Sequence, residues 1–262
     1  MQIDLQIAKL KDWRIQHKQK FLVAGPCSLE SEEQIMQTAL GLSGYGVNLL
    51  RAGIWKPRTR PGTFQGLGAE GLKWLKNAGA AAKIPVAVEV ATPYHVEQCL
   101  KHDIDVLWIG ARTTTNPFSV QLIADSLRGA DVEVMVKNSI NPDIELWIGA
   151  LERLNLAGIK KLMAVHRGFS VFNPTKYKYE PLWEIPTKLK KLIPGIPIIC
   201  DPSHICGETG LLLSVAQKAM DLQFDGLMLE VHIDPQKALS DAKQQITPEA
   251  FKNLINSLKT TL

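Results

Sequence analysis

The sequence lacks the features that mark membrane, secreted and nucleic-acid-binding proteins. It has no apolar run near the ~18 residues that a membrane-spanning helix requires. Residues 1–4 do not begin a basic stretch followed by an apolar one, so we expect no secretory signal. The formal net charge is only +4, without a long run of like charges, which argues against a nucleic-acid surface. We therefore expect a cytoplasmic protein that contacts neither membranes nor nucleic acids.

Disulfide frameworks and nucleotide fingerprints are missing as well. Only four cysteines are present, without framework spacing, and we expect them to be reduced thiols. They are Cys27, Cys99, Cys200 and Cys206. The turn after the first apolar stretch reads GPCS, residues 25–28, whereas a doubly wound sheet usually carries a glycine-rich fingerprint there.

The sequence does contain a repeated alternation of short apolar strands and helices. The predicted strands are 21–26, 48–53, 85–90, 106–110, 132–137, 161–166, 197–202 and 226–232. The predicted helices are 31–42, one ending near 82, 93–101, 117–126, 142–156, 183–193, 208–222 and 248–258. Near-continuous apolar, β-branched strands are typical of parallel sheets with both faces buried. Eight such units predict an α/β fold, a (β/α)₈ TIM barrel over 21–262, with residues 1–20 as a short N-terminal extension.

Every predicted strand delivers a charged residue or a metal-ligand type to its carboxyl end, the end where (β/α)₈ barrels carry their active sites. These residues are Cys27, Arg51, Lys56, Arg58, Glu89, Arg112, Lys137, His166, Arg167, Asp201, His204, Glu230 and His232. A single such residue is usually an ordinary surface charge or a satisfied core group. All eight strands sharing this property indicates an active site.

Two chemical groups stand out among these side chains. Six cations converge from five strands, which predicts ligands that are multiply anionic and phosphorylated. They are Arg51, Lys56, Arg58, Arg112, Lys137 and Arg167. Cys27, His204 and Glu230 combine a thiolate, an imidazole and a carboxylate, a set that suits Zn, Fe, Mn or Co rather than Mg or Ca. A fourth ligand is expected from the loop after the eighth strand, which offers Asp234 and Asp241.

The motifs at these strand ends resemble those of one enzyme family. In order they are GPCS (25–28), RAG (51–53), KPRT (56–59), GAR (110–112), HRG (166–168), DPSH (201–204) and EVH (230–232). The chain resembles type Iβ 3-deoxy-D-arabino-heptulosonate 7-phosphate (DAHP) synthase, which is related to 3-deoxy-D-manno-octulosonate 8-phosphate synthase. The resemblance covers about residues 21–262. It implies a transferase that condenses phosphoenolpyruvate with erythrose 4-phosphate at the entry of the shikimate pathway, in aromatic amino-acid biosynthesis.

The resemblance also implies roles for individual residues. One divalent metal ion, with Mn²⁺ expected first and Fe²⁺, Co²⁺ or Zn²⁺ as alternatives, would be held by Cys27, His204, Glu230 and Asp241. Phosphoenolpyruvate would meet Arg51, Lys56, Arg112, Lys137 and Arg167, and erythrose 4-phosphate would meet Arg58 and Thr59.

Catalytic roles are expected for Cys27, His204, Lys56 and Glu89. Lys56 would move a proton, and Glu89 would orient a water molecule or, alternatively, form a buried ion pair with Lys137. Pro57 and Arg58 in KPRT favour the four-carbon sugar, whereas the octulosonate enzyme, which uses arabinose 5-phosphate, typically carries Lys-Ala-Asn-Arg.

The sequence leaves several alternatives open for the regulation and the assembly of the protein. Family members often carry a regulatory domain or a fused chorismate mutase, for which these 262 residues have no room. The chain is then unregulated, controlled by a chorismate mutase partner, or the catalytic part of a longer protein. Tyr177, Tyr179 and Trp183 are candidates for the surface that meets such a partner or another subunit. We expect a homo-oligomer, a dimer or a tetramer; a barrel that has lost catalysis and serves as a binding module is the competing hypothesis.

Overall fold

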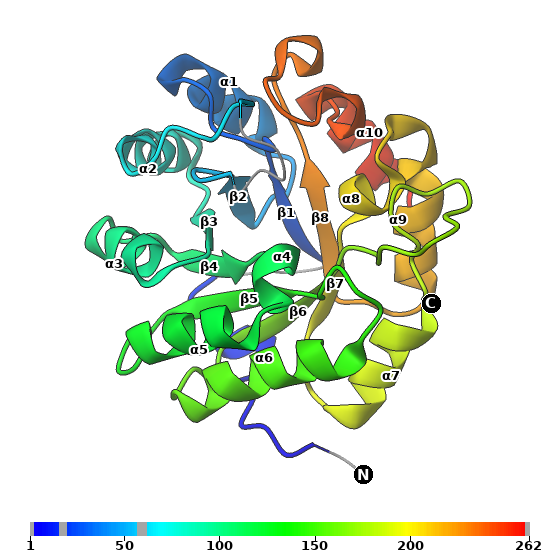
Figure 1. Cartoon of the computed structure of the whole chain (residues 1–262). Helices are drawn as coiled ribbons and strands as arrows, with labels where there is room; N and C mark the ends of the chain where they lie inside the picture. The colour runs from blue at the N-terminus through cyan, green and yellow to red at the C-terminus, as the bar shows by residue number, and fades with distance from the viewer. Residues whose placement is uncertain (1–2, 16–19, 57–61, 260–262) are drawn as a thin grey trace.

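The computed structural model describes residues 3–15, 20–56 and 62–259. In these residues eight parallel strands pair in chain order and close into a barrel (Figure 1). The strands are β1 Phe21–Gly25, β2 Leu49–Ala52, β3 Val86–Val90, β4 Val106–Ile109, β5 Glu133–Lys137, β6 Leu162–His166, β7 Ile198–Cys200 and β8 Gly226–Glu230. The pairing of β1 with β8, from Phe21↔Gly226 to Gly25↔Glu230, completes the closure. The predicted (β/α)₈ barrel is confirmed.

Helices surround the barrel, as Figure 1 shows. They are α1 Glu32–Leu42, α2 Glu70–Ala82, α3 Pro93–Lys101, α4 Ala111–Thr114, α5 Pro117–Ser126, α6 Ile144–Leu156, α7 Glu184–Leu192, α8 Pro202–Cys206, α9 Leu212–Asp221 and α10 Pro248–Ser257. Short 3₁₀ turns are η1 Leu10–Asp12, η2 Thr209–Leu211, η3 Pro235–Lys237 and η4 Ala242–Gln244. The bounds of α3 and α5 agree with the predicted ones, because Thr92 and Asn116 cap helices that begin with proline.

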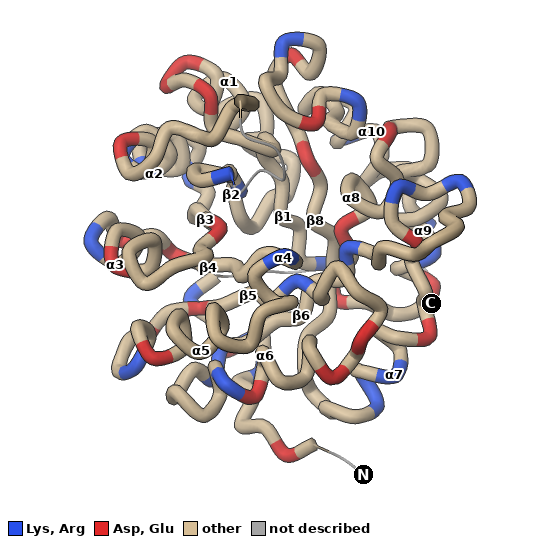
Figure 2. Tube along the Cα trace, viewed as in Figure 1, with Lys and Arg blue, Asp and Glu red and all other residues tan. Residues whose placement is uncertain are grey.

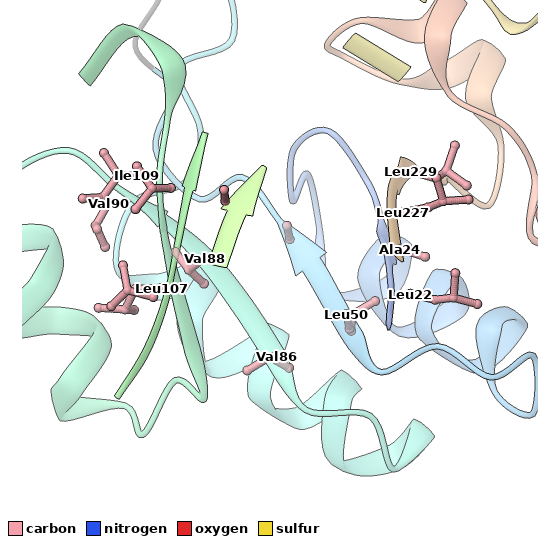
Figure 3. Close-up of a cluster of buried hydrophobic side chains, with 14 of the residues drawn as sticks. Leu22, Ala24, Leu50, Val86, Val88, Val90, Leu107, Ile109, Leu227 and Leu229 are labelled. Carbon is pink, nitrogen blue, oxygen red and sulfur yellow. The ribbon is translucent and has the colours of Figure 1, made fainter. Parts of the chain in front are cut away.

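Alternate residues of each strand pack on opposite sides of the barrel wall. Leu22, Leu50, Val88 and Leu107 belong to the outer cluster that packs against the helices, part of which Figure 3 shows. The intervening residues fill the interior as a second cluster. Its strand members are Phe21, Val23, Leu49, Ala87, Val106, Trp108, Met135, Met163, Val165, Ile199 and Met228. Both faces are therefore buried, as the apolar strands predicted.

Two of the predicted segments were wrong near the seventh strand. The strand ends at Cys200 rather than at Pro202, and Pro202 instead begins the short helix α8. Asp201 caps this helix, its carboxylate accepting a hydrogen bond from His204 N at 3.1 Å. The predicted helix 208–222 is the turn η2 followed by α9. The sequence analysis also missed α4, because four residues are too few for periodicity to show.

The described part of the N-terminal extension packs against the amino end of the barrel. Trp13 and Ile15 are buried in the interior cluster, and the ring of Trp13 meets Phe21 edge-on at 6.2 Å. Arg14 forms an ion pair with the buried Glu133 at 3.2 Å. The division into 1–20 and 21–262 remains a prediction.

The cysteines and the helices bear on two predictions from the sequence, the reduced thiols and the absence of a membrane-spanning segment. All four cysteines are free and buried, as predicted for reduced thiols. Of the helices within the described ranges, none has both the length and the apolar character to cross a bilayer.

Candidate active site

A cavity of about 260 Å³ opens at the carboxyl ends of the strands. Residues at the end of or after each strand from β2 to β8 line it. The lining consists of Lys56, Thr63, Glu89, Gly110, Ala111, Arg112, Lys137, Ile140, Arg167, Lys178, Tyr179, His204 and Asp241. Five of these side chains are cationic and only two are carboxylates, so the cavity is suited to an anionic ligand.

Two of the predicted cations, Arg51 and Lys56, lie close to Cys27. Arg51 is buried; its guanidinium lies 3.3 Å from Glu230 Oε1 and donates to the carbonyl oxygen of Cys27 at 3.2 Å. The guanidinium also lies over the ring of Trp108, 4.9 Å from the ring centroid. Lys56 donates to the same carbonyl oxygen at 2.9 Å and contacts Cys27 Sγ at 3.0 Å. A carboxylate and an aromatic ring thus fix Arg51, and the carbonyl and the thiol of Cys27 fix Lys56.

The other cations come from β4, β5 and β6. Lys137 ends β5 and pairs with the buried Asp201 at 2.8 Å. Arg167 follows β6; its backbone N–H donates to Asn138 Oδ1 at 2.7 Å, and its guanidinium stacks on Tyr179. Arg112 lies on α4, where Figure 2 shows a basic segment above the barrel. All three line the same cavity, as the sequence predicted.

The four predicted metal ligands lie at this end of the barrel and meet in two pairs. Cys27 Sγ lies 3.3 Å from Asp241 Oδ2, and His204 Nε2 lies 3.8 Å from Glu230 Oε1. Within residues 3–15, 20–56 and 62–259, no three His, Cys, Asp or Glu side chains form a closed metal cage as they stand. The ammonium of Lys56 contacts one pair and the guanidinium of Arg51 contacts the other.

The chemistry of this donor set fits a divalent metal. His204 Nδ1 lies 2.8 Å from Asp201 Oδ2, outside ideal hydrogen-bond geometry, so Nε2 is the nitrogen left to face Glu230. Burial lowers the pKa of His204, although Asp201 opposes the shift, and this favours the neutral imidazole. Glu230 Oε1 is buried and accepts no hydrogen bond in the described part of the chain, although Arg51 Nη1 pairs with it at 3.3 Å. A neutral imidazole and a carboxylate oxygen without a hydrogen bond suit a metal.

The thiol would have to lose its proton to bind metal. Burial and the Glu230 carboxylate raise the pKa of Cys27 to about 12, while Lys56 and Arg51 act in the opposite direction. Metal binding at this thiol would therefore release a proton.

Glu89 has a partner that the sequence did not suggest. Its Oε2 accepts a hydrogen bond from Trp108 Nε1 at 3.0 Å. Lys137, the alternative ion-pair partner, is instead bound to Asp201. The carboxylate of Glu89 lines the cavity and crowds Gly110, where an added Cβ would lie 2.1 Å from Oε1.

The two candidate aspartates after β8 differ clearly in the structure. Asp241 lines the cavity beside Cys27, whereas Asp234 pairs with Lys237 at 3.0 Å on the surface. Arg58 and Thr59, predicted to bind the sugar phosphate, lie outside the described residues.

The sequence analysis missed several side chains that surround these groups. Gln244 donates to Glu230 Oε2 at 2.7 Å, and Lys178 contacts Asp241 Oδ1 at 3.1 Å. Tyr179, one of the three candidates for a partner surface, lines the cavity. For Lys178 and Tyr179 the only sequence signal was the unusual length of the loop between β6 and α7, which is typical of functional loops, whereas Gln244 lies in η4 after β8.

Comparisons with known proteins identify the family. The model of the DAHP synthetase I family matches residues 4–262. Phospho-2-dehydro-3-deoxyheptonate aldolase of Thermotoga maritima is 33% identical over 253 residues, covering 97% of this chain and 73% of that protein. A 2-dehydro-3-deoxyphosphooctonate aldolase of Nitratidesulfovibrio vulgaris is 27% identical, covering 91% of this chain and 90% of its own.

Solved structures give the same relationship. The crystal structure of the Thermotoga maritima DAHP synthase superposes with a TM-score of 0.84 at 30% identity, covering 97% of this chain and 72% of that one. A truncated form of the Thermotoga maritima enzyme gives a TM-score of 0.80 at 28% identity, covering 95% of this chain and 89% of that one. The barrel, the motifs at its strand ends and these matches agree: the chain belongs to the DAHP synthetase I family.

Proposed function

We propose that the chain is a 3-deoxy-7-phosphoheptulonate synthase, which condenses phosphoenolpyruvate with erythrose 4-phosphate and releases phosphate. The observation that carries the proposal is one cavity at the carboxyl ends of the strands, lined by residues at the end of or after each strand from β2 to β8. Its five cationic side chains suit two phosphorylated substrates.

Phosphoenolpyruvate is assigned to the cations fixed by the barrel wall. Arg167 is buried, and its Nη1 has no hydrogen-bond partner among the described residues. A phosphate oxygen would satisfy this donor, and Arg112 is assigned to the same phosphate. Arg51, Lys56 and Lys137 would hold the remaining negative charge. Arg58 and Thr59 are assigned to erythrose 4-phosphate on the motif alone.

Cys27, His204, Glu230 and Asp241 are proposed to hold one divalent metal, Mn²⁺ first. Such a metal supplies Lewis-acid polarisation of the aldehyde when it is bound. Asp201 keeps His204 in orientation, and Gln244 does the same for Glu230 by donating to its other oxygen.

Lys56 and Glu89 are assigned to the proton-transfer steps. Carbon 3 of phosphoenolpyruvate bonds to the aldehyde carbon, and Lys56 Nζ delivers a proton to the resulting alkoxide. Glu89, anchored by Trp108, orients the water that attacks carbon 2 and accepts its proton. Phosphate then leaves carbon 2, beside the cations that held it. Fixed positive charge stabilises each developing anion without reorganisation.

We propose a cytoplasmic homo-oligomer as the working form. Several large apolar side chains are exposed on the outer surface, among them Phe118 at 84% and Leu156 at 82%. Sedimentation velocity would distinguish a monomer from a dimer or a tetramer. Addition of a chorismate mutase to the assay would test control by such a partner, and an unchanged rate would reject it.

The test of the function is phosphate release from phosphoenolpyruvate, with erythrose 4-phosphate or arabinose 5-phosphate, before and after chelation. We expect turnover with erythrose 4-phosphate that is lost on chelation and restored by Mn²⁺. Cys27→Ala should abolish this turnover. Cys99→Ala is a matched control, because Cys99 is an equally buried thiol that lies on α3 and is not one of the four proposed metal ligands.

Other outcomes would reject parts of the proposal. Turnover with arabinose 5-phosphate alone would assign the octulosonate reaction. Wild-type turnover in Cys27→Ala would reject the metal assignment. A folded, Mn²⁺-loaded chain that turns over neither sugar phosphate would reject the enzymatic function and favour a binding module.

A further inference from the structure

The loop between β6 and α7 brings two adjacent side chains to opposite halves of the cavity. It runs beside α8 in Figure 1, and Tyr179 N donates to the carbonyl oxygen of Ile205 in α8 at 3.1 Å. A two-way backbone bridge between Phe169 and Glu180, at 2.8 and 2.9 Å, ties the end of the loop to its beginning. Backbone hydrogen bonds at Tyr179 and Glu180 therefore hold this end of the loop, with the neighbouring Lys178, in place.

Tyr179 covers the guanidinium of Arg167. The guanidinium carbon lies 3.6 Å from the ring centroid, a close cation–π contact. Arg167 is buried with one unpartnered nitrogen, as described above. With one face of the guanidinium covered by the ring, its edge is the part that remains to bind a ligand.

Lys178 contacts the metal-ligand half of the site. Its Nζ lies 3.1 Å from Asp241 Oδ1 and 3.0 Å from Gln244 Oε1. Because an ammonium only donates, the amide of Gln244 must turn its oxygen to Lys178 and its NH₂ to Glu230, which it meets at 2.7 Å. Lys178 therefore orients Asp241 directly and Glu230 through Gln244. Asp241 Oδ2 is left to face Cys27.

Two glycines make room for this pair. Gly168 has φ +78°, and an added Cβ would lie 2.7 Å from the carbonyl oxygen of Tyr179. Gly207 has φ +70°, and an added Cβ would lie 2.6 Å from Lys178 Cβ. Both glycines combine a left-handed backbone with a close approach to the loop, so the surrounding fold accommodates both side chains.

We propose that Lys178 and Tyr179 are positioning residues that set the two halves of the site separately: Lys178 orders the metal ligands, and Tyr179 orders the arginine that receives phosphoenolpyruvate. This inference rests on the proposed function, because it uses the same ligand assignments. Both residues lie outside the motifs at the strand ends. Each is expected to affect the binding of a different ligand: Lys178 that of the metal, and Tyr179 that of phosphoenolpyruvate.

The sequence provides its own controls, because residues 176–179 read Lys-Tyr-Lys-Tyr. Lys176 lies over the ring of Tyr177, with its Nζ 5.4 Å from the centroid. Neither residue lines the cavity described above. A lysine and a tyrosine can therefore be substituted at the site, at residues 178 and 179, and in the same way beside it, at residues 176 and 177.

The test is two calorimetric titrations of the full, chelator-treated chain, one with Mn²⁺ and one with phosphoenolpyruvate in the absence of sugar phosphate. Lys178→Met should weaken Mn²⁺ binding on the order of 10-fold, with a much smaller effect on phosphoenolpyruvate. Tyr179→Ala should weaken phosphoenolpyruvate binding on the order of 10-fold, with Mn²⁺ binding unchanged. Lys178→Arg and Tyr179→Phe should restore most of each affinity, and Lys176→Met and Tyr177→Ala should change neither.

The outcomes separate this inference from the proposed function. Wild-type protein that binds neither ligand would reject the site assignment, and the inference with it. Wild-type protein that binds both, with unchanged Mn²⁺ binding in Lys178→Met or unchanged phosphoenolpyruvate binding in Tyr179→Ala, would overturn the inference alone. Equal losses of both ligands in either variant, or the same losses at residues 176 and 177, would also overturn it.

Discussion

Asp201→Asn is the most informative single change, because it removes a charge and keeps a helix cap. Asp201 is fully buried and pairs with Lys137, which is 4% exposed, at 2.8 Å. Asparagine is as good an N-cap as aspartate and can still accept the hydrogen bond from His204 N. The variant leaves the Lys137 ammonium buried without a counter-charge, and it also removes the charge that faces His204 Nδ1 at 2.8 Å.

The expected magnitude follows from the distance. At 2.8 Å and an effective dielectric constant of about 20, the gross attraction is about 6 kcal/mol. Desolvation of both ions offsets part of this, whereas an abandoned buried charge typically costs about 3–5 kcal/mol. We expect Asp201→Asn to lower the free energy of unfolding by about 3–5 kcal/mol.

A double-mutant cycle checks the cause. Lys137→Met removes the same pair from the other side, and in the double variant neither ion is left alone. The double variant should be more stable than the sum of the two single losses predicts, by about 1–3 kcal/mol. Guanidinium unfolding monitored by circular dichroism measures all four proteins. Losses that add to within about 0.5 kcal/mol would show that the pair does not stabilise the fold and would refute the reasoning.

Three further predictions concern both ends of the barrel. Trp13→Ala should lower unfolding free energy by about 3–5 kcal/mol in calorimetry, with kcat/KM unchanged; lost activity in folded protein would contradict this. Glu89→Gln should lower kcat by about 100-fold and leave the KM for phosphoenolpyruvate unchanged in steady-state assays. Burial and Arg167 lower the pKa of His166 to about 3, so between pH ~6.5 and about 3 only the unfolded chain protonates at this position, and the free energy of unfolding falls by about 1.4 kcal/mol for each unit by which the pH is lowered. His166→Gln should flatten that slope in unfolding experiments; an unchanged slope would refute it.

The sequence predicted much of the site because its signals are local. Strand ends can be read from apolar runs, and parallel strands in a closed barrel must deliver their carboxyl ends to one face. These two facts were sufficient to predict that Lys56, Arg112, Lys137 and Arg167 lie together, and in the structure all four line one cavity. The choice of Asp241 over Asp234 came from family spacing, and the structure has Asp241 beside Cys27.

The partners of these groups were not predictable in the same way. The alternative pairing of Glu89 with Lys137 was wrong: Lys137 binds Asp201, and Glu89 binds Trp108. Both candidate carboxylates lie at the carboxyl end of a strand and have the same charge. Only the directions of the side chains across the barrel distinguish them, and these directions depend on the packing of distant residues.

The sequence by itself therefore determined the strand–helix alternation, the order of the motifs and the chemical groups at each strand end. The tertiary structure decided which groups meet, including Trp13 with the barrel interior and Lys178 with Asp241, 63 positions apart. The physical reason is the separation along the chain over which each interaction acts. Hydrophobic periodicity and helix caps act over a few residues, whereas ion pairs and aromatic contacts depend on where the closed barrel puts residues that are remote in the chain.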